Sequence, residues 1–310
     1  MSTAVEAAPP QFMPTPSQLA VAYSVCRHIA RSSARNFYYA FLVLPRPKRR
    51  ALCAVYAYMR HCDDIADDGS LSLEDRRTRL NAALEALHRA QAGQPTDDAV
   101  LLALIDTQRR FRIPAELLDQ LAHGTLMDVE GSPTDADQSL VVHYQSFADL
   151  YQYCYRVASV VGLVCIRVFG YRDPSAERLA EHLGLAFQLT NIIRDVQEDT
   201  AMGRVYLPEH DLAAFGISAS DLRHPESARK TAALLAMEAE RAREFYRAGD
   251  ELLPLISEDS QPALWVLITI YRRLLDKIAE KQYDVFHGKI RLSTMEKTGV
   301  LMRGFLKRLA

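Results

Sequence analysis

The sequence predicts an all-α fold, a single helical bundle. Three observations carry this prediction. Apolar residues recur every three or four positions along most of the 310-residue chain, which is the spacing of one helix face. No stretch shows the strict alternation that marks a strand, and no internal repeat is evident. The length allows one large domain or two ordinary ones. We expect one domain over residues 17–310, preceded by a flexible leader over residues 1–16.

Boundary signals place the individual helices. Ser146 and Asp149 look like a capping box, Pro114 and Pro174 suit the first turn of a helix, and Gly69 is expected to stop one. We expect the polar residues 32–37 to break the first helix and to lead, through a loop, into a core segment that ends at Pro45. The expected helices cover residues 17–30, 51–68, 74–93, 97–112, 115–131, 150–170, 174–199, 226–256, 262–287 and 296–309.

The stretch from Gly184 to Asp199 carries a polar stripe on an apolar helix. Its side chains at three- and four-residue spacing share one face. They are Gly184, Gln188, Asn191, Asp195 and Asp199. A helix that is apolar on most sides is normally buried, and an unpaired buried carboxylate is very costly. We therefore expect a cation between the acidic side chains. Mg²⁺ suits this setting because it commonly binds one or two carboxylates together with a substrate's phosphates.

A second acidic cluster ends the helix predicted over residues 51–68. Asp63 and Asp67 continue its apolar face, and Asp64 and Asp68 lie beside them. Carboxylates at a helix C-terminus oppose the helix dipole, so local physics disfavours this arrangement. One such cluster could be an ordinary solvated helix end. Two clusters on two apolar helices favour a shared cation site instead.

Composition excludes several classes of function. A formal net charge of -2 argues against a nucleic-acid partner, because binding to phosphates requires basic protein. The five cysteines contain no C-x-x-C pair, which fits reduced thiols in the cytoplasm. The N-terminus lacks the pattern of a secretory signal, and no uncharged run is long enough to predict a membrane span. The basic helix over residues 296–309 has two interpretations, a solvated helix or a peripheral contact at the inner membrane face.

These features together predict a site for a metal-bound diphosphate. Metal ions held by two facing acidic helices would neutralise a leaving diphosphate as Lewis acids. Arg60, Arg194 and Arg204 lie in or beside the motifs and could clamp the phosphates, although each could also be an ordinary ion-pair partner. Small residues and aromatic rings elsewhere suit a hydrocarbon tail and a carbocation, although core packing alone would also explain them.

The motifs also resemble those of a known family. DDIAD (63–67), NIIRDVQED (191–199) and GRVYLP (203–208), with FYYAFLVLP (37–45), YCYRVASVVG (153–162) and GLAFQLTNIIRD (184–195), resemble the squalene/phytoene synthase family. The resemblance extends over residues 20–290. It implies an isoprenoid synthase fold around a central cavity. It also implies head-to-head (1′-1) condensation of two prenyl diphosphates with about two to three Mg²⁺ ions.

The resemblance assigns roles by position. Asp63, Asp67, Asn191, Asp195 and Asp199 would bind the metal. Arg60, Arg194, Arg204 and Tyr206 would contact diphosphate, and Gln188 would line the site between the motifs. Tyr153 would assist proton removal near a cyclopropyl intermediate, and Ser33 and Phe37 would belong to the cavity-forming N-terminal segment. The implied catalytic residues are Asp63, Asp67, Asp195, Asp199 and Tyr153.

Within the family, the FYYAFLVLP run, the NIIRD motif and the YDVFHGKIRLS tail (283–293) look most like the bacterial hopanoid-pathway enzyme. That enzyme makes presqualene diphosphate from two farnesyl diphosphates. The alternatives are a phytoene synthase that uses geranylgeranyl diphosphate, or a squalene or dehydrosqualene synthase, with NADPH needed only if the reaction continues to squalene. Two alternatives lie outside this family. One is a terpene cyclase or head-to-tail prenyltransferase, and the other is a non-catalytic assembly factor. The expected partners are prenyl diphosphates and the enzymes that act next in the pathway.

Overall fold

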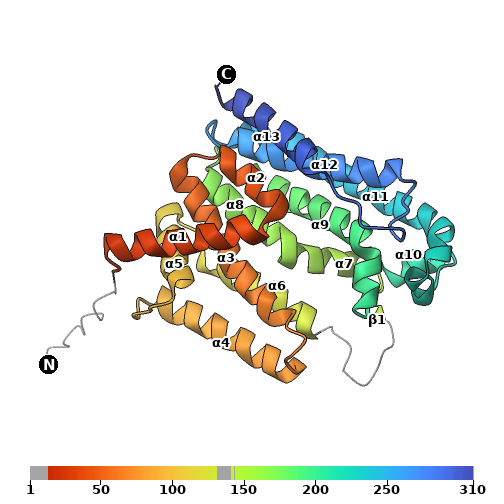
Figure 1. The fold of residues 1–310 in the computed structure, drawn as a ribbon, viewed down its shortest axis with the longest axis horizontal. Coiled ribbons are helices and arrows are strands. Elements are labelled where there is room, and N and C mark those ends of the chain that lie inside the picture. Colours follow the sequence, from red (N-terminus) through yellow and green to blue (C-terminus); the bar gives the residue numbers. More distant parts are fainter. Residues whose placement is uncertain (1–12, 131–140, 143, 310) are drawn as a thin grey trace, which may run out of the picture.

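The computed structural model describes residues 13–130, 141–142 and 144–309, and these are almost entirely helical. The predicted all-α class is confirmed, and Figure 1 shows the helices stacked side by side. The α-helices are α1 (Pro16–Ser33), α2 (Arg35–Val43), α3 (Arg46–Ala66), α4 (Leu73–Gln91), α5 (Ala99–Phe111), α6 (Ala115–Glu130), α7 (Phe147–Cys154), α8 (Val160–Phe169), α9 (Ser175–Ala201), α10 (Glu209–Ala214), α11 (Ala228–Leu252), α12 (Gln261–Glu280) and α13 (Thr294–Leu309). Short 3-10 turns cover Ala219–Arg223, Pro225–Ser227 and Leu253–Leu255.

Helix α9 is the centre of the bundle. It packs against α7, α8, α11 and α12, and Figure 1 shows it running through the middle of the molecule. Leu185, Ala186 and Ile193 are fully buried, as the apolar sequence around the polar stripe predicts. On the N-terminal side, α1, α3 and α5 pack on one another, and α3 also packs on α8, which is a neighbour of α9.

Two expectations about the N-terminal half are wrong. The segment predicted as a loop forms helix α2, because Phe41, Val43 and Leu44 are buried and α2 packs against α12 and α13. Nine residues are too few for helical periodicity to be read from sequence. The acidic helix also ends at Ala66 rather than at Gly69. Asp68 accepts hydrogen bonds from the backbone N–H and hydroxyl of Ser70, and this side-chain turn replaces the expected glycine stop.

The helix predicted over residues 150–170 is divided into three parts. It begins at the predicted capping box of Ser146 and Asp149 and is interrupted by a π-helical turn, η1 (Tyr155–Ser159), between α7 and α8. By length and composition, Phe147–Phe169 could cross a membrane, but half of its most apolar window is buried in the bundle. A core helix passes the same test, so this is weak evidence for a span.

Gly184 brings α9 into close contact with the π-helical turn. A Cβ at this position would lie 2.6 Å from Cα of Ser159 and 2.9 Å from the carbonyl oxygen of Ala158. Gly162 likewise allows α8 to approach the carbonyl of Ala180. Both obstacles are backbone atoms, which cannot rotate away. These small residues therefore serve helix packing.

One short parallel pairing interrupts the all-helical pattern in the described ranges. Strand β1 (Val141–Val142) pairs with β2 (Arg204–Val205). Two residues are too few to give the alternation by which a strand is recognised, so the sequence did not predict this pairing. It fixes the backbone of the GRVYLP segment directly after α9.

An arginine beside a buried acid ties α11 to α10. Arg241 donates from Nη1 to both carboxylate oxygens of Glu238, at 2.8 and 2.9 Å, and to Asp211 at 2.9 Å. Glu238 is only 1% exposed. Burial raises the pKa of Glu238 to about 7, and the nearby charge of Asp211 adds to the effect, against the lowering influence of Arg241. Arg241 is therefore the ion-pair partner of both Glu238 and Asp211.

We expect Gly184→Ala to destabilise the fold by about 1–3 kcal/mol, because the added methyl group meets backbone atoms. Urea unfolding followed by circular dichroism measures this change. Gly299→Ala is the control, because a Cβ at that helical position meets nothing within 4 Å, and the better helix propensity of alanine should make it neutral or slightly stabilising. Equal stability of the two variants would contradict the packing role of Gly184.

We expect the folded protein to lose stability as the pH rises from about 4.5 to 7. Glu238 binds its proton more tightly in the folded state, so its contribution is complete below its ordinary pKa and is lost as the pH passes through its raised pKa. The loss amounts to at most about 3 kcal/mol. Glu238→Gln should flatten the profile of unfolding free energy against pH. Glu240→Gln, an exposed residue of the same helix, should leave the profile unchanged.

Candidate active site

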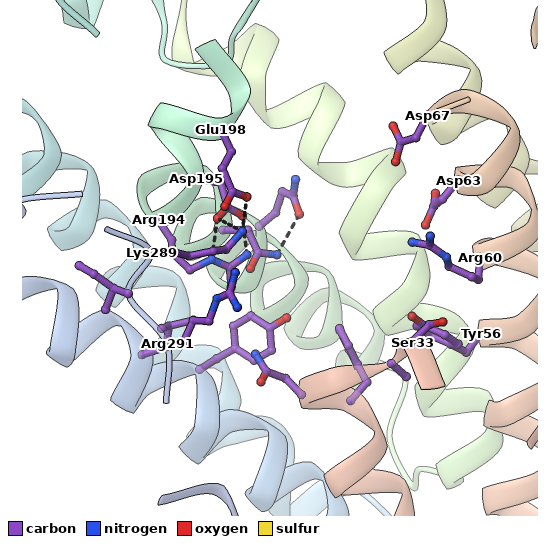
Figure 2. Close-up of a pocket in the computed structure, with 18 of the residues that line it drawn as sticks. Ser33, Tyr56, Arg60, Asp63, Asp67, Arg194, Asp195, Glu198, Lys289 and Arg291 are labelled. Atoms are coloured by element: carbon purple, nitrogen blue, oxygen red, sulfur yellow. Dashed lines mark hydrogen bonds and ion pairs between the residues drawn. The ribbon is translucent and has the colours of Figure 1, made fainter. Parts of the chain in front are cut away.

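A cavity with a volume of about 790 Å³ lies between α3 and α9. Figure 2 shows the acidic side chains of the two helices on opposite sides of this space. The predicted site residues that line it are Ser33, Phe37, Arg60, Asp63, Asp67, Gln188, Asn191, Arg194, Asp195 and Arg204. Two distant parts of the chain therefore contribute to one site, as the sequence predicts.

Helix α3 forms one side of the cavity, which we call the α3 wall, and helical spacing explains which of its side chains face the cavity. Tyr56, Arg60, Asp63 and Asp67 lie three or four residues apart, so they share one face, and all four line the cavity. Asp63 is half-buried, and Asp67 is exposed at the C-cap of the helix. The hydroxyl of Thr125 on α6 donates to Oδ1 of Asp63 at 3.5 Å.

Helix α9 forms the opposite side of the cavity, the α9 wall, with the same three- and four-residue spacing of polar side chains. Gln188, Asn191 and Asp195 follow at three- and four-residue spacing on the cavity side. The Nδ2 group of Asn191 donates to Oε1 of Gln188 at 3.5 Å. Oδ1 of Asn191 is buried, and no described residue gives it a hydrogen bond. A buried acceptor of this kind is costly unless it is satisfied, so Oδ1 is available to a cation in the cavity.

Asp195 is neutralised by two basic side chains. Arg194 donates to it from Nε at 2.8 Å and from Nη2, and Nζ of Lys289 lies 3.2 Å from Oδ1. Lys289 also forms an ion pair with Glu198, one turn further along α9. Burial alone would raise the pKa of Asp195, but Arg194 and Lys289 outweigh it and hold that pKa below its ordinary value. Lys289 thus stands between the carboxylates of Asp195 and Glu198 on this helix.

Several cavity residues were missed by sequence analysis. Lys289, Arg291 and Lys297 line the cavity from the segment after α12 and from the start of α13, and Glu198 lines it from α9. The segment HGKIRLS (287–293) served only for its resemblance to a family member, and its basic residues were assigned no role. Glu198 lies three residues after Asp195, so helical spacing could have found it.

Three predicted residues lie outside the cavity lining. Asp199 and Tyr206 line a small recess with Arg204, which also reaches the main cavity. Tyr153 is buried, and its ring stacks on that of Tyr206 with centroids 5.1 Å apart. Tyr144 lies against the same pair, 5.4 Å from Tyr153. These aromatic rings support the segment that carries Arg204.

An apolar pocket of about 140 Å³ adjoins the polar cavity. The two share Phe37, Gln188, Asn191 and Tyr271. The rings of Phe187 and Tyr271 are stacked with centroids 4.5 Å apart, and Phe37 lies 5.9 Å from Tyr271. Aromatic rings thus stand where the charged cavity meets the apolar pocket, and their faces can stabilise a cation.

The residues fit a divalent metal that a substrate helps to bind. Among the described ranges, no group of three or more His, Cys, Asp or Glu side chains lies close enough to hold a metal alone. Each wall instead offers one or two carboxylates, and Asn191 adds an unsatisfied oxygen. Mg²⁺ is typically held in this way, by few carboxylates and by substrate phosphates.

Comparisons with known proteins agree with this site. A model of the squalene/phytoene synthase family matches residues 30–296. The chain is 34% identical over 295 residues to a 15-cis-phytoene synthase of Synechococcus elongatus, and the match covers 91% of each chain. It is 36% identical over 289 residues to a phytoene synthase of Mycobacterium tuberculosis, which covers 92% of this chain and 90% of the relative.

Solved structures give the same result. A dehydrosqualene synthase matches with a TM-score of 0.82 and 29% identity over 93% of this chain and 96% of its own. A squalene synthase, HpnC from Alicyclobacillus acidocaldarius, matches with a TM-score of 0.76 and 29% identity over 87% and 97% of the two chains. The predicted isoprenoid synthase fold is confirmed, and the protein is an enzyme of the prenyltransferase type. On these grounds the chain belongs to the squalene/phytoene synthase family.

Proposed function

We propose that the protein condenses two farnesyl diphosphates head-to-head to presqualene diphosphate, with Mg²⁺ as the metal. The observation that carries this proposal is the pair of acidic walls facing each other across a basic-lined cavity that opens into an apolar pocket. A diphosphate head suits the cavity and a prenyl tail suits the pocket. The acting unit is proposed to be one domain over residues 17–310.

Each group of residues has a defined task in this proposal. Asp63 and Asp67 on one wall, with Asn191 and Asp195 on the other, hold the metal. Bound Mg²⁺ supplies Lewis-acid neutralisation of the leaving diphosphate. Arg60, Arg194, Arg204, Lys289 and Arg291 bind the phosphate oxygens through charge-assisted hydrogen bonds. Phe37, Phe187 and Tyr271 line the route of the tail, exclude water and stabilise the allylic cation.

The aromatic layer behind Arg204 has a positioning task. Asp199 and Tyr206 share a recess with Arg204, and Tyr153 stacks on Tyr206. We propose that this layer holds the Arg204 guanidinium toward the diphosphate. The proton-removing role of Tyr153 stays a prediction, and Ser33 is proposed to contact substrate from the end of α1.

The length of the prenyl chain separates the main proposal from its alternative. The FYYAFLVLP and YDVFHGKIRLS segments favour farnesyl diphosphate, whereas the names of the sequence relatives favour two geranylgeranyl diphosphates and phytoene. The test is incubation with each diphosphate and Mg²⁺, with and without NADPH, followed by mass spectrometry. Presqualene diphosphate from the C15 substrate supports the proposal. Phytoene alone would replace it, and squalene formed only with NADPH would extend it.

A cytoplasmic location is proposed with this function. All five cysteines are free, and four are buried. Burial raises the pKa of the Cys26 thiol to about 12, which keeps it protonated and unreactive. Structural thiols of this kind suit a reducing compartment. The proposed partners are prenyl diphosphates and the enzymes that consume the product.

We expect Asp63→Ala and Asp195→Ala each to abolish turnover, by at least about a thousandfold, because each removes a ligand for metal-bound diphosphate. Helical content measured by circular dichroism should stay at the wild-type level. Asp68→Asn is the control, since Asp68 belongs to the turn after α3 and does not line the cavity. If either alanine variant keeps the wild-type rate, the assignment of that wall is wrong.

We expect Lys289→Met to weaken binding of Mg²⁺-pyrophosphate by about tenfold or more, because a charge-assisted hydrogen bond is lost. Isothermal titration calorimetry measures this without turnover. Lys277→Met is the control, because it makes the same substitution at a lysine that pairs with Glu296 outside the cavity. This variant should bind Mg²⁺-pyrophosphate with wild-type affinity. Equal affinities of the two variants would remove Lys289 from the proposed clamp.

A further inference from the structure

Arg241 on α11 joins two segments that lead away from the same short strand pair. Its Nη1 donates to Asp211 on α10 at 2.9 Å, and its guanidinium lies 4.2 Å from the centre of the Phe147 ring at the start of α7. An arginine over an aromatic face is held there by cation–π attraction. We call these three side chains the Arg241 clamp. None of them is among the described residues that line the main cavity.

Both segments run directly from the strand pair that holds Arg204, at the end of the bundle where Figure 1 shows α10 and β1. Asp211 follows Arg204 by seven residues, and Phe147 follows the end of β1 by five. Between them, the backbone N–H of Glu209 donates to the carbonyl oxygen of Tyr144 at 2.9 Å, and the next two residues pair in the same way at 3.0 Å. The two segments thus form one hydrogen-bonded unit, with Arg204 at one end and the clamp at the other.

The same unit supports the aromatic rings next to Arg204. The ring of Tyr144 is stacked on that of Tyr206 with centroids 6.4 Å apart, and it lies 5.4 Å from Tyr153. Tyr206 shares the small recess with Arg204. A shift of residues 144–147 relative to α10 would therefore change the packing of the rings beside Arg204.

The clamp is anchored by a charge that stability alone does not require. Glu238 is buried, and both of its carboxylate oxygens accept from the same Nη1 of Arg241. Buried ion pairs are weak evidence for stability, because apolar residues of similar volume often serve as well. Their best-attested use is to fix one arrangement of the chain among several. Glu238 holds the Arg241 guanidinium in place on α11, so Asp211 is tied to a fixed point of the bundle.

We propose that Arg241 is a positioning residue, which through the Arg241 clamp holds Arg204 in the orientation that binds a diphosphate. This inference rests on the proposed function, in which Arg204 contacts the diphosphate, and it adds to that site a residue outside the cavity. The rival explanation is that the ion pair only fixes α10 to the bundle. Positioning predicts weaker ligand binding that depends on Arg204, whereas simple packing predicts lower stability with unchanged binding.

The test is a double-mutant cycle on the full chain, in which isothermal titration calorimetry measures the binding of Mg²⁺-pyrophosphate at a temperature well below unfolding. Asp211→Asn breaks the clamp and leaves Glu238 paired with Arg241, so no buried charge is left alone. We expect this variant to bind about fivefold more weakly, as for residues that act through others. Arg204→Gln should bind about tenfold more weakly, because a charge-assisted hydrogen bond is lost. The double variant should bind no more weakly than Arg204→Gln alone.

Asp250→Asn is the control, because it makes the same substitution at an equivalent contact. Asp250 on α11 pairs with Arg272, whose guanidinium lies 5.7 Å from the centre of the Tyr246 ring. None of these three side chains is among those that line the cavity in the described part of the chain. The control should bind Mg²⁺-pyrophosphate with wild-type affinity. Equal loss in this variant would reduce the effect to net charge and overturn the inference.

Two further results would overturn the inference. One is wild-type affinity in Asp211→Asn, even with a lower free energy of unfolding, because simple packing of α10 predicts that result. The other is a double variant whose loss equals the product of the two single losses, because the clamp would then not act through Arg204. Absence of Mg²⁺-pyrophosphate binding by the wild type would refute the proposed function as well. A product other than presqualene diphosphate would replace the proposed reaction and leave the inference standing.

Discussion

The electrostatic balance around Asp195 is the constraint on which the site depends. This carboxylate is only 18% exposed, and burying such a charge unpaired would be very costly. Arg194 and Lys289 neutralise it, and Lys289 extends the network to Glu198. The two cations come from different places, one from α9 itself and one from the segment between α12 and α13. The Asp195 carboxylate therefore remains charged, with its pKa held below the ordinary value.

The separation of charged and apolar surfaces gives the site its second property. The polar cavity and the apolar pocket meet at Phe37 and Tyr271, which line both. This boundary exists because α2 is a helix that packs against α12, which brings Phe37 onto the Tyr271 ring. A charged head group and a hydrocarbon tail can then occupy neighbouring environments of very different polarity. A cation formed between them would face aromatic rings rather than water.

Motif residues fall into two layers. Asp63, Asp67 and Asp195 line the cavity, whereas Asp199 and Tyr206 line a small recess with Arg204, and Tyr153 stacks on Tyr206. Both groups belong to the motifs of the sequence, because a motif contains neighbours in the chain whether or not their side chains line the same space. The β1–β2 pairing fixes the backbone of Arg204 itself.

Spacing along single helices was enough to predict the all-α class, most helix boundaries and the two acidic faces. Asp63 with Asp67 and Gln188 with Asn191 and Asp195 are local patterns of this kind. Contacts in the folded chain were needed to show that α2 is helical and that Lys289, Arg291 and Lys297 line the cavity. The folded chain also places Asp199 and Tyr206 in a small recess with Arg204. Those facts depend on contacts between segments far apart in the chain, and no local pattern encodes which segments will meet.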